Sequence, residues 1–190
     1  MIEFINNGDL MNGGGRITSA NYFKRIIRAA KLDATLYEEV EADKTSLGQA
    51  LGMVVLSSVA AGVGTLGLAG GIQTVLSGTF LAVTGWLFWA FLTYWIGTRL
   101  LPEAQTRADW GELLRTTGFS SAPGLLRVFG LLPGLTEIVF LIAGVWMLAA
   151  MVVAVRQALD YQSTGRAIGV CIIGWPLHAV VLFALLFLFG

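Results

Sequence analysis

Charged residues and cysteine are scarce in this sequence, and each scarcity excludes a class of function. Charged residues make up 13% of the 190 residues, whereas soluble domains carry about 25%. The formal net charge is zero, so the chain lacks the basic excess of nucleic-acid-binding domains, and we expect no nucleic-acid partner. The one cysteine, Cys171, has no second cysteine with which to form an internal disulfide bond or a metal site. We expect no metal and no cofactor.

The scarcity of charge is concentrated in long uncharged runs. No Asp, Glu, Lys or Arg occurs from Thr45 to Thr98, and this run is long enough for two membrane crossings because a helix needs about 20 residues to cross the hydrocarbon core. Its middle, at Gly70 and Gly71, has the glycines typical of a turn. Two more uncharged runs follow, Ile138–Val155 and Ala167–Gly190. The sequence therefore predicts an all-α, polytopic membrane protein.

We predict five transmembrane helices, at about residues 47–69, 78–96, 113–132, 135–155 and 168–189. The third is ambiguous, since Arg115, Pro123 and Arg127 fall within it and hydropathy alone would make it a re-entrant or interfacial segment. The distribution of basic residues favours five crossings. With a cytoplasmic N-terminus, five crossings leave only Arg127 towards the far side of the membrane, whereas four would also export Arg156 and Arg166. The C-terminus then lies on the side opposite the N-terminus.

The pattern divides the chain into three segments: a flexible polar arm at 1–18, a cytoplasmic or interfacial region at 19–44, and a five-helix membrane domain at 45–190. We expect the arm to stay in the cytoplasm because it lacks the basic start and apolar core of a signal peptide. Apolar residues within 21–31 repeat with helical spacing, which predicts an amphipathic helix. Four basic residues on its other face are expected to contact anionic lipid: Lys24, Arg25, Arg28 and Lys31.

An acidic motif stands ahead of the first crossing and is the most distinctive polar feature: Tyr37, Glu38, Glu39, Glu41 and Asp43. Glu39 and Asp43 are four residues apart, a repulsive spacing on one helix, so we expect the helix to break near Asp43 or the carboxylates to find basic partners. Two interpretations remain open. The motif either forms an internal ion-pair cluster, which we favour, or docks a basic partner. The expected internal countercharges are Arg99, Arg107 and Arg115.

Small and ionisable residues in the predicted spans indicate how the helices associate. Small residues at four-residue spacing allow close helix packing in lipid, and we assign this role to Gly48, Gly52, Ala60 and Gly64. The intramembrane polar residues are Arg127, Glu137 and His178. An arginine in the membrane is costly unless it snorkels or finds a partner. Glu137 lies just across a predicted turn from Arg127, so an ion pair and snorkelling are both open.

Two of these spans contain the side chains of a Ser/His dyad, as used by intramembrane serine proteases. Ser120 would need His178, the only histidine, within hydrogen-bonding distance. Serines next to small residues in a span more often serve packing, with their hydroxyls bonded to their own helix. His178 also suits haem or a pigment, but one histidine gives such a ligand weak support. We therefore predict that neither residue is catalytic and that the protein is not an enzyme.

Several segments occur in a distinctive order: Leu32–Asp43, Gly48–Leu51, Gly97–Leu101, Gly118–Leu126, Val153–Asp160 and Thr164–Ile168. In this order they resemble the bacterial Yip-domain family of membrane proteins. The resemblance extends from about Phe23 to the C-terminus and implies five membrane helices with a cytoplasmic N-terminus. Eukaryotic Yip proteins resemble adaptors that bind Rab-type GTPases. This chain has a much shorter N-terminal region, so GTPase binding is not carried over. The family has no catalytic residues to transfer.

The sequence thus predicts a non-enzymatic membrane scaffold or adaptor that acts through helix packing and a cytoplasmic-face surface. The alternative is a small accessory subunit of a larger respiratory, photosynthetic or transport complex. The expected partners are membrane lipid and either other membrane subunits or further copies of this chain. The expected location is the bacterial inner membrane.

Overall fold

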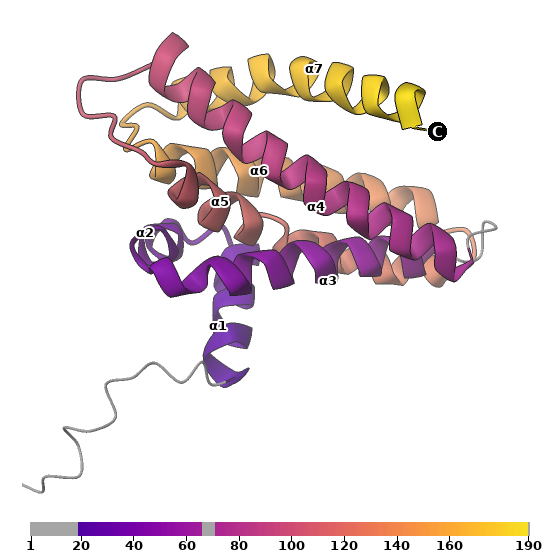
Figure 1. The fold of residues 1–190 in the computed structure, drawn as a ribbon. Helices are drawn as coiled ribbons and strands as arrows, with labels where there is room; N and C mark the ends of the chain where they lie inside the picture. The colour runs from indigo at the N-terminus through magenta and orange to yellow at the C-terminus, as the bar shows by residue number, and fades with distance from the viewer. Residues whose placement is uncertain (1–18, 66–70, 190) are drawn as a thin grey trace, which may run out of the picture.

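The computed structural model describes residues 19–65 and 71–189, and within these ranges the secondary structure is entirely helical (Figure 1). The elements are α1 (Ser19–Ala30), α2 (Ala34–Ala42), η2 (Lys44–Ser46), α3 (Leu47–Thr65), α4 (Ile72–Trp95), η4 (Ile96–Leu100), α5 (Trp110–Phe119), η5 (Ala122–Leu131), α6 (Thr136–Ala158) and α7 (Thr164–Phe189). The polar arm at 1–18 and the end of the first predicted span, 66–69, lie outside the described residues.

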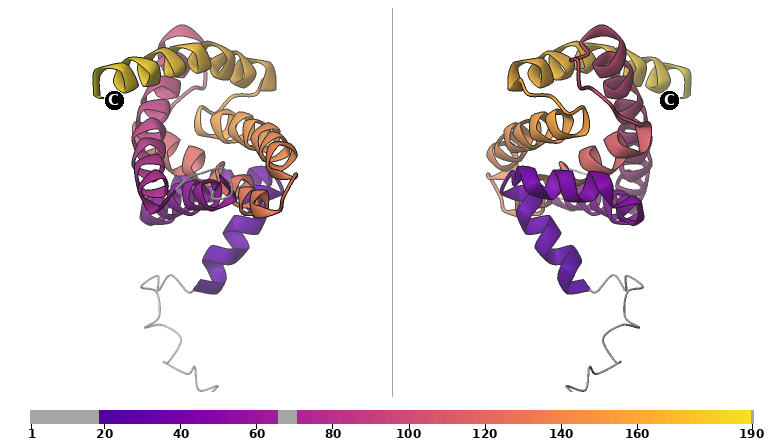
Figure 2. Two further views of the ribbon diagram at one scale, coloured as in Figure 1. Left: turned by 90° about the vertical axis from the view of Figure 1, so that its right-hand side faces the viewer. Right: turned by 90° about the vertical axis from the view of Figure 1, so that its left-hand side faces the viewer.

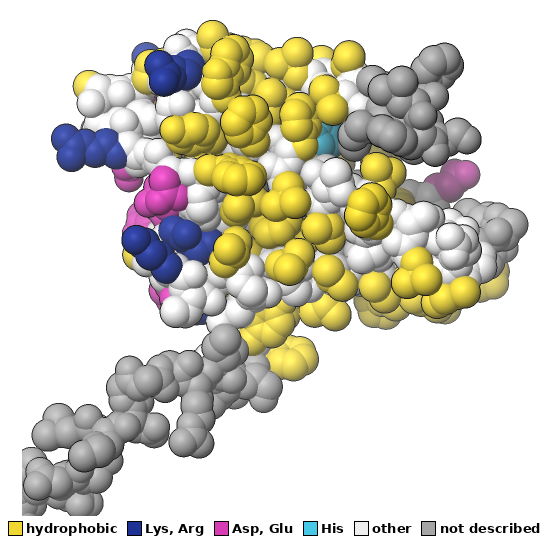
Figure 3. All heavy atoms as spheres, viewed as in Figure 1, with side chains coloured by type: hydrophobic (Ala, Val, Ile, Leu, Met, Phe, Trp, Pro, Cys, Tyr) yellow, Lys and Arg dark blue, Asp and Glu magenta, His cyan; other side chains and the backbone are white. Residues whose placement is uncertain are grey.

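Four helical segments in the described ranges are long and apolar enough to cross a membrane: Lys44–Thr65, Ile72–Leu100, Thr136–Ala158 and Thr164–Val181. In Figure 3, Lys, Arg, Asp and Glu side chains gather at the end of the bundle that holds α2, and hydrophobic side chains cover the middle. Such a belt matches the hydrocarbon core of a bilayer. The chain is an integral membrane protein.

The third predicted span, 113–132, differs from the expected regular helix. It consists of the ten-residue helix α5 followed by the 3₁₀ segment η5. Pro123 at the start of η5 lacks a backbone N–H, which favours a break in the α-helix here. The two pieces nevertheless run from one end of the bundle to the other, since Arg115 contacts α2 and Gly130 lies against Gly64 of α3. The segment therefore follows the length of the bundle without forming a fifth long helix.

Close backbone contacts hold α5 and η5 against α3. A side chain at Gly64 would overlap the carbonyl oxygen of Arg127, and one at Gly118 would come within 2.6 Å of the Cβ atom of Ala50. Without a hydrophobic driving force between helices in lipid, such close packing supplies dispersion contacts. The broken segment is therefore packed against α3, with α5 buried in the bundle and the second half of η5 reaching the surface, where Val128 and Phe129 are 37% and 54% exposed.

The long helices surround α5, as the view along the bundle shows (Figure 2). Helix α1 projects sideways, across the direction of the long helices (Figures 1 and 2). Helix α7 starts at the end of the bundle near α2 and runs to the opposite end, where the described chain stops (Figure 1). Pro176 lies within α7 without ending it.

Candidate functional site

Two arginines of α1 bind three carboxylates in and around α2, and we call this group the ionic clamp. Arg25 pairs with Glu39 and with Asp43, each at 3.0 Å. Arg28 pairs with Asp33 at 2.7 Å and with Glu39 at 2.6 Å. The clamp fixes the angle between α1 and α2, because both arginines bridge the two elements.

The sequence around the turn from α1 to α2 explains this geometry. Leu32 adopts a positive φ of 60°, which reverses the chain direction after α1. Asp33 then caps α2 by accepting a hydrogen bond from the backbone N–H of Thr35. The hydrogen bonds from Arg28 and then from Thr35 lower the pKa of Asp33 to about 2. The turn therefore holds an ionised carboxylate beside Arg28.

The predicted repulsion between Glu39 and Asp43 is resolved by both expected means. Helix α2 ends at Ala42, so Asp43 lies outside it with an extended backbone. Arg25 contacts both carboxylates and also donates to Oε1 of Gln49. Only 16% of the Arg25 side chain is exposed, so its charge is held within the protein.

The sources of the countercharges differ from the prediction. We assigned Arg25 and Arg28 to the lipid-facing surface, but they form the clamp, whereas Lys24 and Lys31 are exposed. The described residues show no ion pair between the acidic motif and the expected countercharges Arg99, Arg107 and Arg115. The sequence pattern missed this arrangement because it treated α1 as a separate interfacial helix.

Arg115 has a role that the sequence did not indicate. Its side chain comes from α5, is 5% exposed, and donates hydrogen bonds to the carbonyl oxygens of Val40 and Glu41. These carbonyls are at the C-terminal end of α2, where the helix dipole favours a positive charge. A capping box between Asp109 and Glu112 fixes the start of α5, one turn before Arg115. Arg115 therefore ties α2 to the inner segment of the bundle.

The acidic motif divides between inner and outer faces of α2. Tyr37 is fully buried and donates a hydrogen bond to the carbonyl oxygen of Ala29 at 3.3 Å, and burial raises its pKa. Glu39 and Asp43 belong to the ionic clamp. Glu38 is exposed and accepts a hydrogen bond from Gln157 of α6. Part of the motif therefore stabilises the end of the bundle, and part faces outward.

Four acidic side chains from three parts of the chain form an acidic patch beside the clamp: Glu38, Glu41, Glu112 and Asp160. The pKa of Glu41 is raised to about 7, first by burial and then by the negative charges of Glu112 and Asp160. Arg115 opposes this shift because its positive charge lowers the pKa. The sequence indicated only the two patch residues in α2, Glu38 and Glu41, because Glu112 and Asp160 are far from them along the chain.

A family model, the Yip1 domain, matches residues 34–186. The chain belongs to the Yip1 domain family. The match begins at α2 and includes all the long helices, so the acidic motif lies inside the family's domain and α1 lies ahead of it. No curated protein and no solved structure matches.

The loops at the same end of this Yip1 domain are held together by polar contacts. Tyr161, between α6 and α7, donates hydrogen bonds to the carbonyl oxygens of Gly97 and Leu101 after α4. Burial raises the pKa of Tyr161 to about 12. Glu103 pairs with Arg166 at 3.4 Å. These contacts hold the α4–α5 and α6–α7 connections next to the acidic patch.

The two residues of the hypothetical protease dyad do not bond to one another in the described part of the Yip1 domain. The Ser120 hydroxyl donates to the carbonyl oxygen of Thr117 at 2.7 Å and contacts the sulfur of Met151 at 3.6 Å. His178 packs against the rings of Phe88 and Trp89, with centroid distances of 5.8 and 5.4 Å. Its Nδ1 atom is buried without a hydrogen-bond partner among the described residues.

The remaining predicted residues are divided between surface and interior. Glu137 is exposed and forms no ion pair with Arg127 among the described residues, so of the two alternatives left open the ion pair is absent. Ala60 is buried, Gly64 packs against η5, and Gly52 faces the hydroxyl of Tyr22. Gly48 differs from its expected packing role, because it is exposed with no atom near its Cβ position.

Proposed function

We propose that this Yip1-domain protein is a non-enzymatic membrane scaffold or adaptor, which presents the acidic patch to a basic partner. The acidic patch is the observation that carries this proposal. It combines side chains of α2, α5 and the α6–α7 connection, so it exists only when the end of the bundle is assembled. The ionic clamp and Arg115 make that end a fixed structure.

The charges of the patch argue for docking and against a purely structural role. Glu39 and Asp43 bind arginines, whereas Glu38 and Glu41 belong to a cluster of like charges with Glu112. Carboxylates that crowd together raise one another's pKa and disfavour the ionised state. A basic segment placed over the patch would relieve this repulsion and steer association electrostatically.

We further propose that the patch faces the cytoplasm of a bacterium and that α1 lies in the membrane interface. On α1, Phe23 and Ile27 are 66% and 54% exposed, while Lys24 of α1 and Lys31, directly after it, are exposed and basic. Apolar and basic side chains on one laterally projecting helix suit the boundary between acyl chains and anionic headgroups. In this orientation, α5 and η5 together form the third of five crossings and the C-terminus lies outside. Small-GTPase binding is not part of the proposal.

Site-specific crosslinking in native membranes tests the docking function. A photo-crosslinking amino acid at Ala42, which is exposed at the end of α2, would capture a protein bound over the patch. The full-length protein is compared with a Glu38→Gln, Glu112→Gln variant and with Glu137→Gln, an exposed acid at the opposite end of the bundle. We expect a defined crosslinked band with the wild type and with Glu137→Gln, and its loss in the double variant.

The result that contradicts the scaffold proposal is a crosslinking pattern that all three proteins share. The native mass in mild detergent distinguishes the adaptor from the alternative function, an accessory subunit of a larger complex. A single large stoichiometric complex that persists in the double variant would identify an accessory subunit held by its membrane helices. A monomer or small homo-oligomer with patch-dependent crosslinks supports the adaptor.

A further inference from the structure

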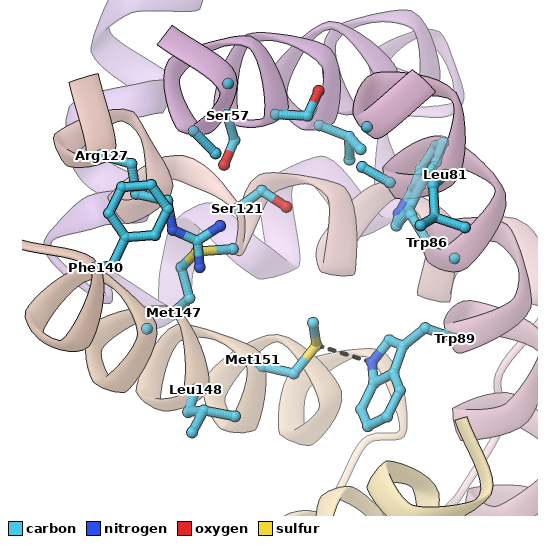
Figure 4. Close-up of a pocket in the computed structure, with 18 of the residues that line it drawn as sticks. Ser57, Leu81, Trp86, Trp89, Ser121, Arg127, Phe140, Met147, Leu148 and Met151 are labelled. Carbon is cyan, nitrogen blue, oxygen red and sulfur yellow. Dashed lines mark hydrogen bonds between the residues drawn. The ribbon is translucent and has the colours of Figure 1, made fainter. Parts of the chain in front are cut away.

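A cavity of about 840 Å³ lies within the membrane-spanning part of the protein, between α3, α4, η5, α6 and α7. Figure 4 shows its walls, which include Trp86 and Leu81 of α4 on one side and Met147 and Met151 of α6 on the other. This volume is within the range of small-molecule sites, about 300–1,000 Å³. Apolar walls of this kind suit a hydrocarbon chain.

One charged side chain projects into this apolar space. The guanidinium group of Arg127 points into the cavity from η5 and lies 5.5 Å from the ring centroid of Phe140 (Figure 4). Its Nε atom is buried and has no hydrogen-bond partner in the described part of the chain. The side chains of Ser57 and Ser121 line the same end of the cavity (Figure 4). This end therefore offers donors for an anion.

An arginine in this position is costly without an anionic partner. A cation in a low-dielectric environment loses hydration, and a contact with an aromatic ring replaces only part of it. None of the ion pairs between described residues includes Arg127. A bound anion would supply the missing interaction, since hydrogen bonds between guanidinium and phosphate groups are among the strong ones in proteins.

The cavity reaches the lipid-facing surface. Among the residues that line it, Leu141 of α6 and Trp175 of α7 are 67% and 60% exposed. Both lie in helices apolar enough to span the bilayer. A ligand therefore has access from the hydrocarbon phase, where the available anionic amphiphile is a phospholipid.

The polarity of the cavity matches the orientation of a lipid. Arg127 is at the end of the bundle far from the acidic patch, because its carbonyl group adjoins Gly64, one residue before the end of α3. From there the cavity extends past Met147 to Trp89 and Met151. A headgroup at Arg127 would thus lie near one membrane surface, and its acyl chain would run towards the middle of the bilayer.

We propose that the cavity binds an acyl chain of one anionic phospholipid from the leaflet opposite the acidic patch, with the lipid phosphate on Arg127. This site is independent of the proposed docking function, since it lies at the other end of the bundle. The lipid would complete the gap between α4, α6 and α7 and satisfy the buried guanidinium. Occupancy would therefore link the lipid composition of that leaflet to the packing of the bundle.

Native mass spectrometry of lipid retained by the full-length protein tests this site. The protein is reconstituted into bilayers of equal parts phosphatidylcholine and phosphatidylglycerol and then transferred to a mild detergent. We expect the wild type to retain one phosphatidylglycerol in preference to phosphatidylcholine, because the choline ammonium group of the latter offsets the charge of its phosphate, whereas phosphatidylglycerol has a net negative charge. Arg127→Gln should reduce this retention about tenfold or more, because the lost hydrogen bonds involve charged groups. Arg127→Lys, which keeps the charge, should retain most of the preference.

A second pair of variants tests the cavity without changing charge. Gly144 lines the cavity and Gly48 does not, and neither has an atom within 4 Å of its Cβ position. Gly144→Leu should abolish retention of the lipid, while Gly48→Leu should not change it. Equal retention of both lipids by the wild type, undiminished retention by Arg127→Gln, or capture of a free fatty acid in place of the phospholipid would overturn the proposal. Patch-dependent crosslinking should be unaffected by Arg127→Gln, so the two proposals fail separately.

Discussion

Replacement of Arg115 by methionine gives the sharpest test of how the end of the bundle is held together. Methionine keeps most of the side-chain length but removes the charge and every donor. The variant therefore leaves the C-terminal carbonyl groups of α2 without the guanidinium that they contact in the wild type. Arg115→Lys keeps the charge but has no fork of donors, and Arg107→Gln is a control at an exposed arginine.

The structure sets the magnitude of the effect. The carbonyl oxygen of Val40 keeps a hydrogen bond from the Ser46 hydroxyl, so the main loss falls on the carbonyl group of Glu41. A hydrogen bond to a charged group contributes about 1.5–3 kcal/mol, and a cation at a partly buried helix C-terminus adds up to about 2 kcal/mol. We expect Arg115→Met to lower the free energy of unfolding by about 3 kcal/mol, which for a chain of this size corresponds to a decrease in Tm of roughly 6–12 °C.

The measurement is thermal unfolding in a mild detergent, followed by far-UV circular dichroism, together with hydrogen exchange of the α2 amides. We expect Arg115→Met to lower the Tm and to increase exchange in α2, Arg115→Lys to give an intermediate result, and Arg107→Gln to match the wild type. A Tm for Arg115→Met within about 2 °C of the wild type would refute the reasoning. It would mean that Arg115 is not a structural tie between α5 and α2.

Three further predictions concern single positions. Glu41 has a pKa raised from 4.5 to about 7 in the folded state. The folded protein therefore holds this proton more tightly than the unfolded chain, and the wild type should lose stability as pH rises between these values. Glu41→Gln should remove this loss, and parallel profiles of stability against pH for the two proteins would contradict the prediction. Gly64→Ala should lower the Tm by several degrees in the same unfolding assay, because its Cβ atom would overlap the Arg127 carbonyl, whereas Gly48→Ala, in open space, should not. Ser120 should not react with a fluorophosphonate probe, since the described structure shows no hydrogen bond between Ser120 and His178. Ser120→Ala and His178→Ala should also leave patch-dependent crosslinking unchanged. Covalent labelling of Ser120 that requires His178 would contradict this prediction.

The membrane character of the chain was readable from the sequence because it depends on composition along single segments. The uncharged runs predicted helices at 78–96, 135–155 and 168–189, and the structure has helices over these ranges. The break near Asp43 was also predictable, since a local repulsion between two carboxylates four residues apart is a property of one helix. These features need no knowledge of which helices touch.

The third span shows where such local reasoning stops. The segment 113–132 is apolar and long enough for a membrane-spanning helix, but the backbone leaves the α-helix after Phe119 and continues as η5. This conformation is stable because α3 makes close contacts with it. Gly64 of α3 lies against the carbonyl group of Arg127, and Ala50 of α3 lies against Gly118. Hydropathy describes the average environment of a segment and carries no information about these contacts.

The sequence by itself determined that this chain lies in a membrane, where its long apolar helices occur, and that its charges gather ahead of the first span, because each of these follows from the transfer of local segments between water and lipid. Only the tertiary structure decided the partners of those charges. It gave Arg25 and Arg28 to the acidic motif and Arg115 to the end of α2, and it placed Arg127 in a cavity, with no ion pair to Glu137 among the described residues. Long charged side chains have many partners within reach along the sequence, and the packing of the helices selects among them.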